Sequence, residues 1–198
     1  MTRYAFLGLF LVGLAAIVYV LMSASSGKAS GNPFERYATG HMQALSFAAA
    51  GEPIPGGTFT DADGTLLGLD HFEGRTILVN YWATWCAPCE KEMPALGALQ
   101  TARGSDTFEV VALSVDGMED ADYARRRLGE LGAANIRFRH APLDMGDIIY
   151  GAGVRGFPTT ILYGPDGLEI ARLQGDADWA SLEAIQFIDA VLRQAGER

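Results

Sequence analysis

The stretch "NYWATWCAPCEKEMPAL", residues 80–96, contains both cysteines of this chain, Cys86 and Cys89. A pair at this spacing can be a structural disulfide, half of a metal site or a reversible redox couple. An apolar, strand-like run precedes the pair and a helix-like run follows it. The stretch therefore predicts that Cys86 lies where a strand gives way to a helix.

The sequence on both sides of this stretch predicts alternating strands and helices. Two apolar runs, 75–83 and 108–116, are typical of strands covered on both faces of a sheet. The other expected elements are a hairpin at 59–66 with Asp63-Gly64 at its turn, helices at 90–100 and 119–131, a strand near 136–140, a short helix near 145–150, a hairpin formed by 159–163 and 168–173, and a closing helix from about Trp179 to Gln194. This order predicts an α/β fold with a central mixed β-sheet flanked by helices, the arrangement of the thioredoxin fold, extended by an N-terminal hairpin.

The first residues predict a membrane segment. The run from Tyr4 to Met22 carries no charge and follows Arg3. At about 1.5 Å per residue, a helix of this length spans a hydrocarbon core of ~30 Å. A cleavable signal has a shorter apolar stretch, although residues 23–25 resemble a cleavage site, so both an anchor and a signal remain open. The flanking charges, Arg3 against Lys28, favour an internal amino terminus and a domain outside the cytoplasm.

Three segments follow from these patterns. Residues 1–22 form the anchor or an uncleaved signal, and residues 23–50 form a flexible linker and a short helix. Asn32-Pro33 offers a helix start, and apolar residues recur at helical spacing from Phe34 to Ala48. Residues 51–198 form the thioredoxin-like domain. The acidic net charge of −9 argues against nucleic acid, and the run Arg125–Arg127 is interpreted as a solvated helix face.

Two of the three interpretations of the cysteine pair are weak. A disulfide closing so short a loop stabilises the chain by only about 2 kcal/mol, so it is a poor structural link. A zinc site normally needs four ligands, and the chain's histidines, His41, His71 and His140, are scattered without a partner at ligand spacing. No metal or other cofactor is expected.

The redox interpretation has a physical mechanism. Cys86 falls at the expected N-terminus of a helix, where the positive end of the dipole and free N–H groups stabilise a thiolate. We expect Cys86 to be exposed after Trp85 and to be the attacking thiol. Cys89 lies one turn inward, placed to resolve a mixed disulfide on Cys86. Pro88 lacks an N–H, which is harmless in a first helical turn.

The stretch "LVNYWATWCAPCEKEMPAL" closely resembles the thioredoxin-like proteins of the TlpA/ResA/CcmG group, TlpA most of all. The resemblance covers about residues 40–193 and includes "FTDADG" at 59–64, "FEVVALSVD" at 108–116, "GFPTTIL" at 156–162 and "GLEIARLQGDADWAS" at 167–181. WCxxC alone is moderately specific. Together with the later Phe-Pro-Thr and the apolar segment in front, it is a strong signature.

The resemblance implies roles for residues around the pair. Pro158 would follow a cis peptide bond, sit against Cys86–Cys89 and expose the backbone of Phe157 for strand-like pairing with a client peptide. The implied client-binding residues are Trp85, Ala87, Pro88, Phe157, Pro158 and Thr159. Pro94 matches the proline that kinks the active-site helix in thioredoxins.

The sequence departs from thioredoxin itself at one important position. Thioredoxin has a buried Asp six residues before the first cysteine, and here that position is Asn80, which cannot take a proton. In ResA-like relatives a Glu three residues after the second cysteine tunes the thiols, and Glu92 matches it. A solvated helix acid beside Lys91 is the other interpretation of Glu92.

The resemblance implies a bacterial inner-membrane, single-pass protein whose catalytic domain lies in the periplasm and reduces client disulfides. The implied clients are the copper-site subunit of cytochrome oxidase, its copper chaperone or apocytochrome c. A transmembrane thiol carrier of the CcdA/DsbD kind would re-reduce the pair. A disulfide oxidase or isomerase remains the alternative within the same redox class, because the direction of thiol–disulfide exchange depends on the reduction potential of the pair and not on the motif. A copper-binding assembly factor and a peroxidase are the more distant ones.

Overall fold

The computed structural model describes residues 31–196. Contacts divide the chain between Pro33 and Phe34, and the unit that begins at Phe34 contains every strand and helix discussed below. The run Tyr4–Met22, on which the predicted membrane segment falls, lies outside the described residues. Within 31–196, no helix combines the length and the apolar character that a membrane crossing requires.

An eight-stranded mixed sheet forms the centre of this unit, in the order β1-β8-β7-β4-β5-β6-β2-β3. Its strands are β1 (Leu45–Ser46), β2 (Phe59–Asp61), β3 (Leu66–Leu67), β4 (Thr76–Trp82), β5 (Phe108–Ser114), β6 (Arg139–His140), β7 (Thr159–Tyr163) and β8 (Glu169–Gln174). Strands β4, β5 and β6 are parallel, whereas β7 pairs antiparallel with β4 on one side and with β8 on the other. The predicted mixed sheet of the thioredoxin fold is confirmed.

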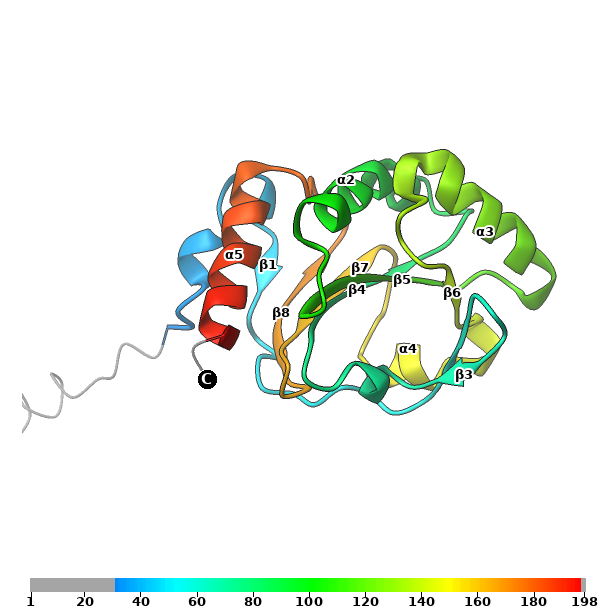
Figure 1. The fold of residues 1–198 in the computed structure, drawn as a ribbon, viewed down its shortest axis with the longest axis horizontal. Helices are drawn as coiled ribbons and strands as arrows, with labels where there is room; N and C mark the ends of the chain where they lie inside the picture. Colours follow the sequence, from blue (N-terminus) through cyan, green and yellow to red (C-terminus); the bar gives the residue numbers. More distant parts are fainter. Residues whose placement is uncertain (1–30, 197–198) are drawn as a thin grey trace, which may run out of the picture. The chain divides into compact units, whose positions relative to one another are not determined.

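Helices cover both faces of the sheet (Figure 1). They are α2 (Ala87–Arg103), α3 (Ala121–Leu128), α4 (Asp147–Gly151) and α5 (Leu182–Gly196), with a π-helical turn at Gly129–Ala133 and short 3-10 turns at Glu35–Tyr37, Gly40–Met42, Leu69–Phe72, Met118–Asp120 and Leu143–Met145. Helices α2 and α3 lie on one face and α4 on the other (Figure 1). Strands β4 and β7 are buried along their whole length, and the burial of β4 on both faces explains its mostly apolar sequence.

Both predicted hairpins are present. Strands β2 and β3 pair across a turn in which Gly64 has φ +88°, a left-handed conformation that favours glycine. Strands β7 and β8 pair across residues 164–167, where Gly167 N–H donates to Gly164 O over 3.0 Å.

The prediction of a helix between Phe34 and Ala48 is wrong. The structure has two 3-10 turns there, followed by strand β1 paired with β8. Thr39 is extended and Gly40 has φ +54°, so a continuous helix cannot pass this point. The segment packs on α5 instead, and the Phe34 ring lies 5.9 Å from that of Phe187.

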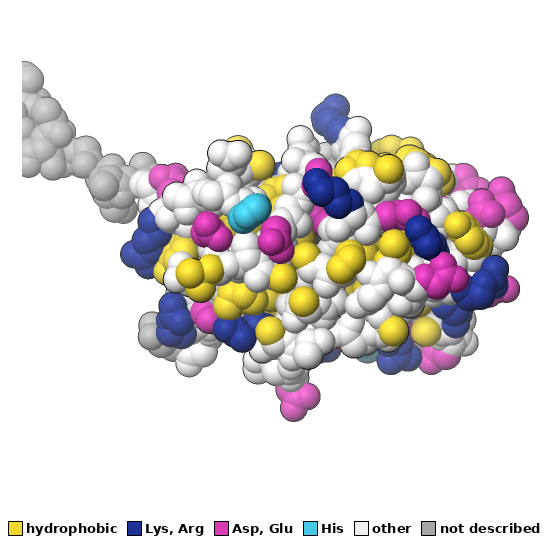
Figure 2. Space-filling view, turned by 90° about the horizontal axis from the view of Figure 1, so that it is seen from above, with side chains coloured by type: hydrophobic (Ala, Val, Ile, Leu, Met, Phe, Trp, Pro, Cys, Tyr) yellow, Lys and Arg dark blue, Asp and Glu magenta, His cyan; other side chains and the backbone are white. Residues whose placement is uncertain are grey.

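The run Arg125–Arg127 is only partly the solvated face that the sequence suggests. Arg127 pairs with Glu90 on α2 at 2.6 Å, and Arg125 stacks over the Phe138 ring at 5.0 Å. On the face shown in Figure 2, basic and acidic side chains alternate rather than gather by sign.

Candidate active site

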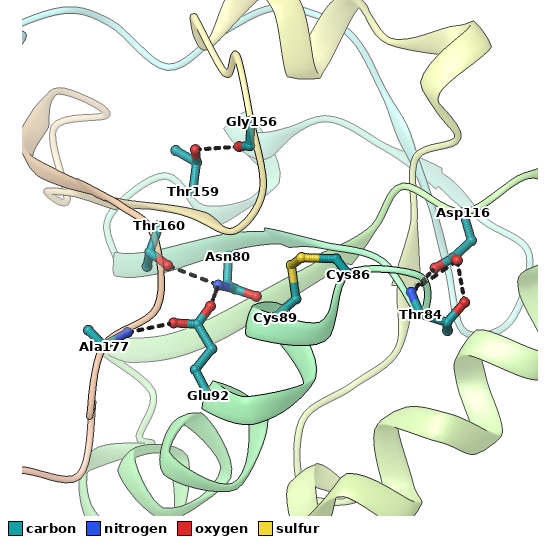
Figure 3. Close-up of a disulfide and its surroundings, with 10 residues drawn as sticks. All are labelled: Asn80, Thr84, Cys86, Cys89, Glu92, Asp116, Gly156, Thr159, Thr160 and Ala177. Atoms are coloured by element: carbon teal, nitrogen blue, oxygen red, sulfur yellow. Dashed lines mark hydrogen bonds between the residues drawn. A yellow bond between two sulfur atoms is a disulfide. The ribbon is translucent and has the colours of Figure 1, made fainter.

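A disulfide between Cys86 and Cys89 lies at the start of α2 (Figure 3). Strand β4 ends at Trp82, and Cys86 is the N-cap of the helix that begins at Ala87. Cys86 is 6% exposed and Cys89 is fully buried. Cys86 is thus less exposed than the sequence suggests, because its sulfur is bonded to that of the buried Cys89. It is still the more accessible of the two.

The first turn of α2 suits a thiolate at Cys86. Pro88 occupies this turn without sacrificing a hydrogen bond, and Glu90 N–H already donates to Cys86 O over 3.1 Å. The N–H groups of Ala87 and Cys89 have no acceptor within the helix, so they add to its positive end. A negative charge on the Cys86 sulfur is therefore favoured at this position.

The loop before β7 lies beside the motif. The Phe157–Pro158 peptide bond is cis, as the resemblance implies. Thr159 donates its hydroxyl to Gly156 O over 2.7 Å, which closes the loop. The ring of Trp85, 61% exposed, meets that of Phe157 edge-on at 5.7 Å. The structure thus brings these predicted client-binding residues together around the start of α2.

Glu92 points into the interior from α2 and is only 2% exposed, so it is not a solvated helix acid. Its Oε1 accepts a hydrogen bond from Asn80 Nδ2 at 2.7 Å. Its Oε2 accepts from Ala177 N–H and Trp179 Nε1–H, both at 3.2 Å. Burial raises the pKa of Glu92 to about 7, although these three hydrogen bonds favour the ionised form.

Asn80, in the middle of β4, is fully buried beside this carboxyl group. Its Nδ2 also donates to Thr160 Oγ1 over 2.9 Å, across the register that pairs β4 with β7. Its Oδ1 is buried without a hydrogen-bond partner among the described residues, and it points toward the side of the disulfide in Figure 3. The position that thioredoxin gives to an acid therefore holds an amide that orients Glu92.

Pro94 lies inside α2, two residues beyond Glu92. Without an N–H, it leaves Glu90 O without its helical partner. A pocket of about 540 Å³ opens beside Glu92, between residues 40–44, this part of α2 and residues 176–178. An ion pair of 2.6 Å between Lys91 and Asp176 lies among its lining residues.

Sequence reasoning missed several residues of this site. It took Trp179 as the beginning of the closing helix, but α5 begins at Leu182, and Trp179 is a buried donor to Glu92. It also gave no role to Thr84 and Asp116, whose side chains are bonded beside the motif (Figure 3). Only the likeness of "LVNYWATWCAPCEKEMPAL", "FEVVALSVD" and "GDADWAS" to the family pointed to these stretches. Within 31–196, no cluster of three or more His, Cys, Asp and Glu side chains is arranged to hold a metal ion.

A thioredoxin fold with a CxxC disulfide at a helix start, beside a cis-proline loop, defines the thioredoxin-like thiol–disulfide exchange proteins. Comparisons with known proteins assign the chain to the same class. The Redoxin family model matches residues 49–142. The thiol-disulfide oxidoreductase ResA of Bacillus thuringiensis is 32% identical over 133 residues, which are 67% of this chain and 74% of that protein.

Solved structures show the same relationship. A DsbE-type thiol:disulfide interchange protein of Chlorobium tepidum superposes with a TM-score of 0.62 and 25% identity, over 72% of this chain and 97% of that one. A thiol:disulfide interchange protein of a Bacteroides species does so with a TM-score of 0.62 and 26% identity, over 77% and 95%. The chain belongs to the ResA-type family of thiol-disulfide oxidoreductases, within the TlpA/ResA/CcmG group. Its redox pair is Cys86–Cys89.

Proposed function

We propose that this protein is a membrane-anchored reductant of client disulfides, with Cys86 as the attacking thiol and Cys89 as the resolving one. The observation that carries these roles is the difference in exposure, 6% for Cys86 against 0% for Cys89, at the N-terminus of α2. A client sulfur can approach only the more accessible cysteine, which is also the one that the helix dipole favours as a thiolate.

The exchange proceeds in two balanced steps. The Cys86 thiolate attacks one sulfur of the client disulfide, forms a mixed disulfide and releases the other client sulfur as a thiolate, which takes a proton. Cys89 then loses its proton and attacks the Cys86 sulfur. The second client thiolate leaves and is protonated, so the client gains two electrons and two protons while Cys86–Cys89 is oxidised.

Glu92 is the proposed acceptor of the Cys89 proton. It lies one turn after Cys89 on α2, and its pKa of about 7 lets it both take and release a proton near neutral pH. The pocket beside it offers a route for exchange with solvent. Asn80 would hold the carboxyl group in place without competing for the proton.

The proposed location rests on the run Tyr4–Met22 and its flanking charges. A domain held at the outer face of a bacterial inner membrane can receive electrons from a transmembrane thiol carrier of the CcdA/DsbD kind. The proposed clients are cysteine pairs in cytochrome assembly, namely the copper-site subunit of cytochrome oxidase, its copper chaperone or apocytochrome c. The family resemblance supports this choice.

The reduction potential of Cys86–Cys89, measured at equilibrium with glutathione, tests whether the protein reduces or oxidises its clients. A reductant in an oxidising compartment needs a low potential, so we expect a value on the thioredoxin side of about −200 mV. We also expect the cellular pool to be mostly reduced, and oxidised once the carrier gene is deleted. A potential near the −120 mV of a strong oxidant, with an oxidised pool in wild-type cells, would make the protein a disulfide donor instead.

A further inference from the structure

Thr84 and Asp116, which follow the neighbouring strands β4 and β5, are in contact beside the redox motif. Strands β4 and β5 are parallel, and Trp82 pairs with Ser114 where both strands end. Thr84 and Asp116 each lie two residues farther along, so they come abreast at the same edge of the sheet. There the Thr84 hydroxyl donates to Asp116 Oδ1 over 2.6 Å, and Thr84 N–H faces both carboxylate oxygens at 3.1 and 3.2 Å.

Thr84 belongs to the turn that delivers Cys86 to the helix. Cys86 N–H donates to Ala83 O over 3.2 Å, so Thr84 and Trp85 are the two central residues of this turn. Both hydrogen-bond donors of Thr84, its N–H and its hydroxyl, are bonded to Asp116. The conformation of the turn is therefore tied to the end of β5 rather than to its own residues alone.

Asp116 is itself held rigidly. It is fully buried, and Ser114 donates its hydroxyl to Asp116 Oδ2 over 2.8 Å. His140 Nε2 lies 2.8 Å from Asp116 O and must donate, because a carbonyl oxygen only accepts. A buried carboxylate is unfavourable unless donors surround it. Three donors, the Thr84 hydroxyl, the Thr84 N–H and the Ser114 hydroxyl, therefore fix the position of this carboxylate. Strands β5 and β6 thereby determine where the turn sits.

We propose that Asp116 is a positioning residue for the redox reaction. The hydrogen bonds between Asp116 and Thr84, called the clamp below, fix the conformation of the turn. The turn then directs the exposed Trp85 ring toward Phe157 and places the Cys86 sulfur at the positive end of α2. The clamp acts through geometry: it holds Cys86 where the helix N-terminus stabilises the thiolate, and it holds Trp85 where a client peptide docks.

Thr84→Val in the full-length protein tests the clamp, because valine keeps the shape and the N–H of threonine but removes the hydroxyl. We expect the pH midpoint for iodoacetamide alkylation of reduced Cys86 to rise, and the rate of insulin disulfide reduction at pH 7 to fall about tenfold, the effect of one well-made hydrogen bond. Thr84→Ser restores the hydroxyl and should stay within about twofold of the wild-type rate.

Thr101→Val is the matched control, since it removes a hydroxyl that donates to Gly97 O over 3.1 Å near the far end of α2. It should lower thermal stability without moving the alkylation midpoint. If Thr84→Val behaves as this control does, the Thr84–Asp116 contact is merely structural and the proposal is wrong.

Asp116→Leu, which removes both acceptor oxygens at similar size, provides a second variant if Thr84→Val does not fold. Loss of the clamp should raise the alkylation midpoint and slow insulin reduction, as in Thr84→Val. Removal of a negative charge by itself would lower the midpoint instead. A lower midpoint with an unchanged reduction rate would mean that Asp116 acts only as a charge, which overturns the positioning role.

Discussion

Asn80 donates its amide N–H to Glu92 over 2.7 Å, and both side chains are buried behind the disulfide. The contact joins the central strand β4 to helix α2, and the same amide group also reaches Thr160 on β7. A carboxyl group that is 2% exposed and raised to a pKa of about 7 is thus held by an amide that cannot itself titrate. This arrangement determines how protonation of Glu92 affects both the stability and the thiols of the protein.

Glu92→Gln should remove a pH-dependent loss of stability. The folded pKa of about 7 lies above the ordinary value of 4.5, so the folded state holds this proton more tightly than the unfolded state. Stability is therefore fully present below pH 4.5 and is lost as pH rises toward 7, by about 3 kcal/mol in total. Urea unfolding of the oxidised protein across this range should show the decline in wild type and not in the variant.

Glu90→Gln is the control with the opposite sign. Its hydrogen bonds to Arg127 lower the pKa of Glu90 below the ordinary value. Ionised Glu90 therefore stabilises the folded state at neutral pH, and this stabilisation is lost as pH falls through the lowered pKa. The stability of Glu90→Gln should accordingly be closest to that of wild type in acid. An unchanged pH dependence in Glu92→Gln would contradict the assignment of Glu92 as a buried, proton-holding group.

Cys89→Ser should trap a client on Cys86 as a stable mixed disulfide, because the resolving thiol is gone while the accessible thiol remains. The products can be separated on non-reducing gels and the modified cysteine identified by mass spectrometry. Cys86→Ser is the matched variant and should trap little, since Cys89 is fully buried. Equal trapping by the two variants would refute the assigned roles.

Asn80→Asp should raise the pH midpoint of thiol alkylation. The new carboxyl group would lie within hydrogen-bond distance of Glu92, and two such acids share one proton and titrate as a pair. An added negative charge behind the cysteines further disfavours a thiolate. Asn135→Asp is the control, because Asn135 donates to Gly97 O and lies away from the disulfide. A midpoint that moves equally in both variants would argue against a local effect.

Gly97→Ala should destabilise the fold by about 1–3 kcal/mol through overpacking. A Cβ at Gly97 would lie 2.5 Å from Gly132 O, where α2 packs against the π-helical turn. Gly129→Ala is the control, because its Cβ would meet only Ala134 Cβ at 3.9 Å and its backbone is helical. Thermal unfolding should separate the two. Equal melting temperatures would show that α2 can move away from the turn at little cost.

Much of the fold could be predicted because each long element carries its own pattern. Buried strands such as β4 and β5 are mostly apolar, and the turns at Gly64 and Gly167 require a conformation that favours glycine. The segment before β2 was mispredicted for a related reason. Its apolar residues repeat at helical spacing, but Gly40 interrupts the helix, and packing against α5 gives those residues another partner.

Local residue types and spacing were enough to predict the CxxC pair and the strand-to-helix junction that carries it. The cis proline was predicted only through the resemblance of its stretch to the family. The fold was needed to show that Glu92 is buried, that Asn80 and Trp179 donate to it, and that Asp116 holds Thr84. Each of the last three is a contact between different parts of the fold, 12, 87 and 32 residues apart in the chain. Such contacts depend on how strands align and helices pack, which no local pattern of residues encodes.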